Sequence, residues 1–134
     1  RMASSNNRIK ARKVIQPETL LKTREVIDSI YIDDNLEDYI LNLVAATRNP
    51  ESYNLSGLAN LIQYGASPRA SIFIHRLSKA YAFIKGRGFV VPQDIKSIGF
   101  DVLRHRVILT YEAEAENVST DDILQKIFDT VEVP

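Results

Sequence analysis

Cysteine is absent from this sequence of 134 residues, and so is any net charge. A chain without thiols forms no disulfide, no thiolate metal site and no cysteine nucleophile, and its composition fits a reducing, cytoplasmic compartment. The 17 basic side chains balance 17 acidic ones, whereas proteins that bind nucleic acid through its phosphates usually carry a basic excess. Nucleic-acid binding is therefore disfavoured.

Long hydrophobic runs and phosphate-binding motifs are also missing. No apolar run approaches the roughly 18 residues of a membrane span, and the first residues lack the apolar core of a signal peptide, so we expect a soluble protein with no membrane span. The pair Gly-Lys does not occur, which excludes the phosphate-binding loop G-x-x-x-x-G-K-[ST]. The chain alone is not expected to hold a nucleoside triphosphate in the usual way, so any nucleotide role must be auxiliary.

The length suits a single domain with its own hydrophobic core. Residues 1–13, RMASSNNRIKARK, are polar and basic and cannot form a buried face. We interpret them as a linker and expect the folded domain to span residues 14–134. Because the sequence starts with Arg1 and not with methionine, we also expect it to be a piece of a longer protein.

Hydrophobic spacing predicts five or six helices with at most a few short extended segments, that is, a mainly α, small helical bundle. Their predicted starts are Pro17, Asp34 with Glu37 in a capping box, a short turn within 51–66, Pro68, Pro92 with an interruption near Gly99, and Ser119 with Asp122 in a capping box. The helix from Pro68 should end near Lys85, before a left-handed Gly86. Segments 30–32 and 107–111 are the candidates for extended structure.

The apolar stripes of these helices predict which side chains form the core. The expected core residues are Leu36, Tyr39, Ile40, Leu43, Phe73, Leu77, Tyr81, Ile123 and Ile127.

The stretch YGASPRASIF, residues 64–73, contains the most unusual feature of the sequence. Ser67 is predicted as an N-cap and Pro68 as the first helical residue, which makes Arg69 the second. A cation at the positive end of a helix dipole costs about 0.3–1 kcal/mol. Arg69 is therefore either a tolerated surface residue or a residue whose partner is an anion.

Other candidate sites have simpler interpretations. His75 lacks a ligand partner at helical spacing, and His75 and His105 are both expected to be structural or exposed to solvent, so no metal site is predicted. The cluster Arg104–Arg106 is expected to form a solvated salt-bridging surface with Asp101 and Glu112.

Several separated motifs occur in a characteristic order. They are YILNLVAATRNP at 39–50, GASPRA at 65–70, VVPQD at 90–94, VLRHR at 102–106 and YEAEAE at 111–116. Together they make residues 14–134 resemble the C-terminal lid of the MoxR family of AAA+ ATPases. The Walker A, Walker B and sensor 1 motifs of the ATPase core are absent from the sequence.

The resemblance implies a helical lid that packs over a nucleotide held by a P-loop core, of the same or a neighbouring subunit, in a homo-oligomeric ring, expected to be a hexamer. Residues 1–13 would then be the tail of the linker from that core. In the family the arginine of the S-P-R turn is the sensor 2 residue, and Arg69 occupies that place as the catalytic candidate.

The same resemblance implies a set of nucleotide-contacting residues, cofactors and partners. The contacting residues would be Gly65, Ala66, Ser67, Pro68 and Arg69, with Gly65 and Ala66 small enough to let the core or nucleotide approach closely. The parent would use ATP and Mg²⁺ and hydrolyse ATP, whereas this piece would bind neither tightly and would be inactive alone. A chaperone-like remodelling role and partners with von Willebrand factor A domains are implied as well.

Two other functions remain open at this point. The chain could be a free-standing helical adaptor that binds another protein through an apolar groove, with Arg69 incidental. It could also bind DNA through Arg104–Arg106 and its basic N-terminal segment, although the zero net charge argues against that.

Overall fold

The computed structural model describes residues 11–134, and helices dominate it. The elements in chain order are α1 (Pro17–Asp28), α2 (Asp34–Arg48), two 3₁₀ helices (Pro50–Tyr53 and Ser56–Leu58), β1 (Ile62–Tyr64), α3 (Arg69–Ile84), α4 (Pro92–Leu103), β2 (Ile108–Leu109), α5 (Tyr111–Ala115) and α6 (Thr120–Thr130). The predicted class, a mainly α bundle with a few short extended segments, is confirmed. Of the predicted linker, residues 1–10 lie outside the described part, and residues 11–13 have no regular structure.

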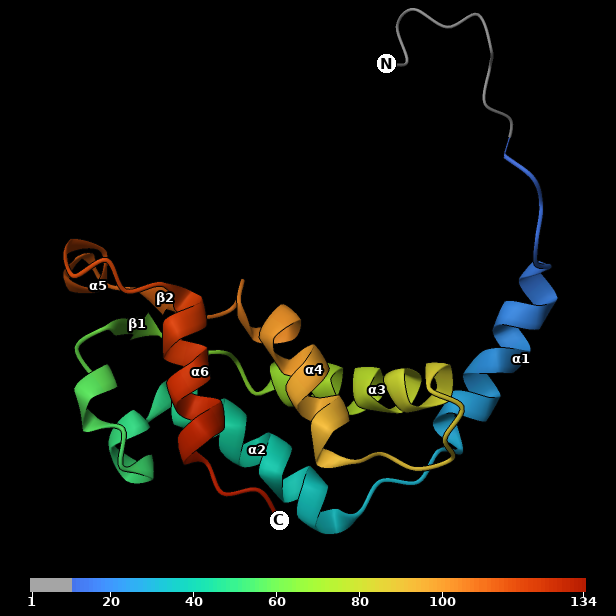
Figure 1. Cartoon of the computed structure of the whole chain (residues 1–134), viewed down its shortest axis with the longest axis horizontal. Helices are drawn as coiled ribbons and strands as arrows, with labels where there is room; N and C mark the ends of the chain where they lie inside the picture. The colour runs from blue at the N-terminus through green and yellow to red at the C-terminus, as the bar shows by residue number, and fades with distance from the viewer. Residues whose placement is uncertain (1–10) are drawn as a thin grey trace, which may run out of the picture.

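Four helices form the body of the domain. α4 packs on α3, α2 packs on α3 and α6, and α6 also packs on α4. Figure 1 shows α1 at one end of this body, next to the end of α3, and the β1–β2 pair with α5 at the opposite end. Among the helices of residues 11–134, none has the length and apolarity to cross a membrane.

Most of the predicted core is confirmed, but the prediction for α3 is wrong. The predicted residues on α2 and α6 are buried, whereas Phe73 and Leu77 are each 45% exposed and Tyr81 is only half-buried. α3 instead buries every fourth residue of another row, namely Ala70, Ile74, Ser78 and Ala82. Three of these four side chains are small, which lets neighbouring helices pack close to α3 and leaves its bulkier residues at the edges.

The start of α2 differs by one residue from the prediction. Asp33, in an extended conformation, is the N-cap, and its carboxylate accepts a hydrogen bond from the Asn35 N–H at 3.0 Å. Asp34 is the first helical residue and contributes favourable charge at the helix N-terminus. Either of two consecutive aspartates could be the N-cap, and the local sequence pattern did not distinguish Asp33 from Asp34.

The predicted interruption of α4 near Gly99 does not occur, because the helix runs unbroken from Pro92 to Leu103. Gly99 is buried beneath the Phe128 ring of α6. A Cβ at this position would lie 3.1 Å from Phe128 Cε1. The glycine therefore serves helix packing and does not mark a break.

A short antiparallel pair of strands was only half predicted. β1 pairs with β2 through Ile62 opposite Leu109 and Tyr64 opposite Ile108. The extended segment at 107–111 was expected, but residues 62–64 were expected to be helical. Their partner lies more than 40 residues away, so local spacing carried no signal for the pairing.

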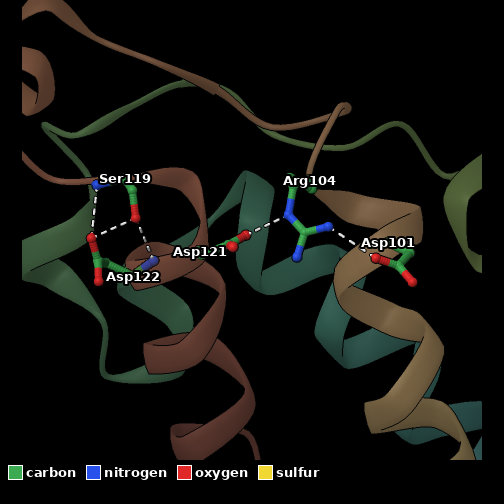
Figure 2. Close-up of polar contacts among 5 residues, drawn as sticks. All are labelled: Asp101, Arg104, Ser119, Asp121 and Asp122. Atoms are coloured by element: carbon green, nitrogen blue, oxygen red, sulfur yellow. Dashed lines mark hydrogen bonds and ion pairs between the residues drawn. The ribbon is translucent and has the colours of Figure 1, made fainter. Parts of the chain in front are cut away.

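Arg104 joins the end of α4 to the start of α6, as Figure 2 shows. Its Nε donates to Asp121 Oδ1 at 2.7 Å and its Nη1 donates to Asp101 Oδ1 at 2.9 Å. These two hydrogen bonds raise the pKa of Arg104 above its ordinary value. The predicted salt-bridging surface is confirmed for Asp101, while the second partner is Asp121 and not Glu112.

The capping box predicted for α6 is also confirmed (Figure 2). The Asp122 N–H donates to Ser119 Oγ at 3.2 Å, and the Ser119 N–H donates to Asp122 Oδ2 at 2.8 Å. The hydrogen bonds from the Ser119 side chain and backbone lower the pKa of Asp122. The bond from Arg104 to Asp121 and the capping box together fix where α6 begins.

Candidate functional site

The turn that leads from β1 into α3 contains the sequence-predicted site residues. Ser67, Pro68 and Arg69 are exposed. Pro68 already has helical backbone angles, with φ −54° and ψ −25°, and Arg69 is the first residue of α3, not the second. No side-chain cap is present, so the predicted N-cap role of the Ser67 hydroxyl is wrong. The Ser67 carbonyl begins the turn instead, by accepting from the Ala70 N–H at 2.9 Å.

The electrostatics of this helix start are favourable for an anion. Two first-turn donors are already used, because the Ala70 and Ser71 N–H groups bond to the Ser67 and Pro68 carbonyls. The attraction for an anion therefore comes mainly from the helix dipole and from the Arg69 guanidinium. Within residues 11–134, Arg69 has no hydrogen bond or ion pair through its side chain. Its charge is free to meet a partner from outside the described chain.

Gly65 and Ala66 pack against the end of α2. A Cβ on Gly65 would lie 2.5 Å from the Thr47 carbonyl carbon and 2.8 Å from the Arg48 Cα. Ala66 has no exposed surface, and its N–H donates to Thr47 Oγ1 at 2.9 Å. The small size of both residues is thus required by contacts within the chain, which differs from the reason that the sequence indicated.

We predict that Gly65→Ala destabilises the domain, whereas Gly57→Ala does not. The atoms that an added methyl at position 65 would meet belong to the backbone of α2, so α2 or the turn must move. Overpacking of this kind costs about 1–3 kcal/mol. At Gly57 nothing lies within 4 Å and φ is not positive, which makes it a matched control. Urea unfolding of both variants checks this, and equal midpoints would contradict it.

A second exposed arginine lies beside the turn. Arg48 ends α2 and, among the residues that the structure describes, takes part in no ion pair. It lines a polar hollow of about 220 Å³ together with Asn49, Gln63 and Gly65. Glu51 lines the same hollow, so the hollow carries both a positive and a negative side chain. A cation is favoured at a helix C-terminus, which accounts for Arg48 at the end of α2.

The remaining candidates have partners within the chain. His75 Nε2 lies 3.0 Å from Glu37 Oε1, which joins α3 to α2 beside an apolar groove of about 240 Å³. Arg106 stacks over the Phe73 ring, with 4.9 Å between its Cζ and the ring centroid. His105 Nε2 lies 2.6 Å from Arg106 Nη1. Arg104 and Arg106 thus have partners within the chain, whereas Arg69 has none through its side chain among residues 11–134.

Sequence reasoning missed two side-chain contacts, one at the site and one at the other end of α3. Thr47 lies within the motif at 39–50, but nothing in the sequence indicated that its hydroxyl would accept a hydrogen bond from the Ala66 N–H. The pair Arg87–Asp94 joins the turn after α3 to the start of α4, with Nη1 donating to Oδ2 at 2.8 Å. Asp94 also accepts from the Val91 N–H at 2.9 Å. An acidic residue three positions beyond the N-cap was the only local signal for that pair.

Comparison with known proteins identifies the family to which this chain belongs. Residues 58–127 match the AAA lid domain family. The chain is similar to the chaperone MoxR1 of Mycobacterium tuberculosis, with 35% identity over 124 residues, which are 92% of this chain and 33% of the relative. It is similar to the protein MoxR of Methylorubrum extorquens, with 33% identity over 112 residues, which are 79% of this chain and 32% of the relative.

A solved structure is similar over the whole chain. The crystal structure of a presumed ATPase from Cytophaga hutchinsonii superposes with a TM-score of 0.92 and 42% identity, and the match covers 100% of this chain and 41% of that one. The chain thus spans about a third of the length of the curated relatives.

Proposed function

Because the chain belongs to the AAA lid domain family and is the lid of a MoxR-type AAA+ ATPase, we propose that it senses the nucleotide of a P-loop core through Arg69. The observation that carries this proposal is the placement of Arg69. It is an exposed cation on the first residue of a 16-residue helix, without a partner in residues 11–134. A cation at a helix start is mildly unfavourable by itself. Its position becomes favourable once an anion binds there.

The chemistry that fits this position is contact with the γ-phosphate of ATP. A guanidinium forms charge-assisted, bidentate hydrogen bonds with phosphate oxygens, and the dipole of α3 acts in the same direction. Arg69 would add positive charge where negative charge develops during phosphoryl transfer. After hydrolysis the charge of the γ-phosphate leaves with it, so the contact distinguishes ATP from ADP and biases the position of the lid.

This chain supplies only part of a nucleotide site. Its sequence contains no loop that could hold the β-phosphate. ATP and Mg²⁺ would be held by the P-loop core, and the lid would contribute Arg69 together with the turn that positions it. In this proposal Ala66 supports Arg69 without contacting the nucleotide, since it is fully buried. Gly65, which is half-buried, and the exposed Ser67 and Pro68 remain proposed contacts.

We predict that the 134-residue chain does not hydrolyse ATP by itself. Phosphoryl transfer depends on residues that position the phosphates and Mg²⁺, and a lid offers one arginine for that purpose. Phosphate release from the purified chain, measured with ATP and Mg²⁺, should equal the rate without protein. A release rate that depends on Mg²⁺ and scales with the concentration of the chain would contradict the prediction.

Membership of the family supports a proposal about assembly and cellular role. We propose that the lid works in a homo-oligomeric ring with a chaperone-like remodelling role, with Arg69 reading the nucleotide of its own or a neighbouring subunit. Proteins with von Willebrand factor A domains are the proposed partners. Sedimentation of a chain that joins this lid to its core, with and without ATP, tests the ring.

The apolar groove between α2 and α3 supports a second candidate function, a free-standing adaptor. Ile40, Leu41 and Ile72 line it, with the His75–Glu37 pair beside them. The gene upstream of Arg1 separates the two functions. A Walker A motif within one domain length, about 150–250 residues, supports the lid function. An unrelated domain there would support the adaptor.

A further inference from the structure

The hydroxyl of Thr47 lies at the junction between the end of α2 and the turn of Arg69. Thr47 has no exposed surface. Its Oγ1 donates to the Val44 carbonyl at 2.7 Å and accepts from the Ala66 N–H at 2.9 Å. One side-chain oxygen thus links α2 to a residue 19 positions later in the chain.

Only a short, rigid path separates this hydrogen bond from Arg69. Ala66 is followed by Ser67 and Pro68, whose ring fixes its φ, and then by Arg69. The Ser67 carbonyl is held by the Ala70 N–H, and Gly65 is in contact with the backbone of α2 on the other side. A shift of Ala66 relative to α2 is therefore transmitted to the start of α3.

The hydroxyl does more than fill space. Valine has nearly the shape of threonine, so packing alone would be satisfied by either residue. Without the hydroxyl, the buried Ala66 N–H would lose its partner, and a buried donor without a partner is costly enough to make the turn move toward water.

We propose that Thr47 is a positioning residue, which holds the Arg69 turn at a fixed place on the end of α2 through its hydrogen bond to Ala66. This inference rests on the proposed function for the role of Arg69, but the hydrogen bond itself can be tested in this chain alone. Thr47→Val removes the hydroxyl at constant shape, and Thr47→Ser retains it as the matched control.

The first experiment is amide hydrogen exchange in the 134-residue chain. In Thr47→Val the Ala66 amide should exchange about tenfold faster or more, relative to the Ile74 amide in α3, whereas in Thr47→Ser the ratio should stay near the wild-type value. The Ile74 amide corrects for any change in global stability. An unchanged ratio in Thr47→Val would overturn the proposal.

The second experiment is a double-mutant cycle in an ATPase that joins this lid to a P-loop core. Thr47→Val should lower kcat about tenfold, because misplacement of a charge near the reacting phosphate reduces the rate steeply. Thr47→Ser should remain within about twofold of wild type, since it keeps the hydroxyl. Arg69→Ala should then cost about tenfold less in the Thr47→Val background than in the wild type, because Thr47 acts through Arg69.

The outcomes separate the two proposals. If Arg69→Ala is equally harmful in both backgrounds, Thr47 does not act through Arg69 and the inference is wrong, while the proposed function stands. If Arg69→Ala is harmless in the wild type, the proposed function fails, and with it the role of Thr47 as a positioning residue for sensing.

Discussion

Arg69→Ala is expected to lower ATP hydrolysis about 10²-fold in an ATPase that joins this lid to a P-loop core, the usual scale for the loss of one preorganised donor that stabilises charge. The side chain is exposed on the first residue of α3 and bonds to no other residue between 11 and 134. Its removal therefore deletes a contact with the nucleotide and leaves the interior of the lid intact. Steady-state hydrolysis at saturating ATP measures the effect on kcat.

The fold of the lid should not change in this variant. Removal of a cation from the positive end of the helix dipole is neutral or slightly stabilising, by at most about 1 kcal/mol. Arg76→Ala is the matched control, because Arg76 is exposed two turns further along the same helix. Near-wild-type hydrolysis in Arg69→Ala, or a loss of the same size in Arg76→Ala, would return Arg69 to the interpretation as a tolerated surface residue.

Asp94→Ala is expected to have the largest effect on stability, about 3–5 kcal/mol, the scale for breaking a buried ion pair by removing one partner. The Asp94 side chain is 2% exposed, and it accepts hydrogen bonds from Arg87 and from the N–H of Val91, the N-cap of α4. Arg87 also donates to the Phe89 carbonyl at 3.0 Å, so the pair fixes the whole turn between α3 and α4. A domain of this size has about 5–15 kcal/mol of total stability, which makes the loss severe.

The stability that Asp94 contributes should depend on pH. Burial raises the pKa of this carboxyl, but the hydrogen bonds from Arg87 and Val91 outweigh burial and lower the pKa below the ordinary 3.8. A carboxyl with a lowered pKa in the folded state stabilises the fold above its unfolded-state value and loses that contribution as the pH falls through the folded-state value. The difference between wild type and Asp94→Ala should therefore be complete at pH 7 and shrink below about pH 3.8.

Chemical unfolding at pH 7 and at acidic pH measures both parts of this prediction. Asp101→Ala is the control, because it removes the exposed partner of Arg104, and exposed pairs contribute at most about 1 kcal/mol. Equal midpoints for Asp94→Ala and Asp101→Ala at pH 7 would show that the buried pair does not hold the turn.

Local signals explain why so many elements of this fold were predictable. The capping box of Ser119 and Asp122, the proline at the start of α1 and the left-handed Gly86, with φ 72°, each act within a few residues. The stripe of α2 was predictable because large apolar residues fill its buried face. Helices whose caps and stripes agree can be placed from sequence alone.

The features that were mispredicted depend on distant partners. The buried face of α3 depends on how closely the neighbouring helices approach it. The small Ala70 and Ser78 are therefore buried, while the bulkier Phe73 and Leu77 are exposed. At the candidate site, the placement of Arg69 in the first turn of α3 followed from the GASPR sequence. The hydrogen bond that anchors its turn did not, because Thr47 and Ala66 are 19 residues apart.

The most direct test of the account compares the affinities for ATP and ADP. In an ATPase that joins this lid to a P-loop core, calorimetry with ADP and with a non-hydrolysable ATP analogue should be carried out for the wild type, Arg69→Ala and Arg76→Ala. Arg69→Ala should weaken binding of the analogue about tenfold or more, as expected for the loss of hydrogen bonds to a charged group, and should leave the affinity for ADP nearly unchanged. Arg76→Ala should alter neither affinity. An Arg69→Ala variant that still prefers the analogue over ADP as strongly as the wild type does would contradict the claim that Arg69 reads the γ-phosphate.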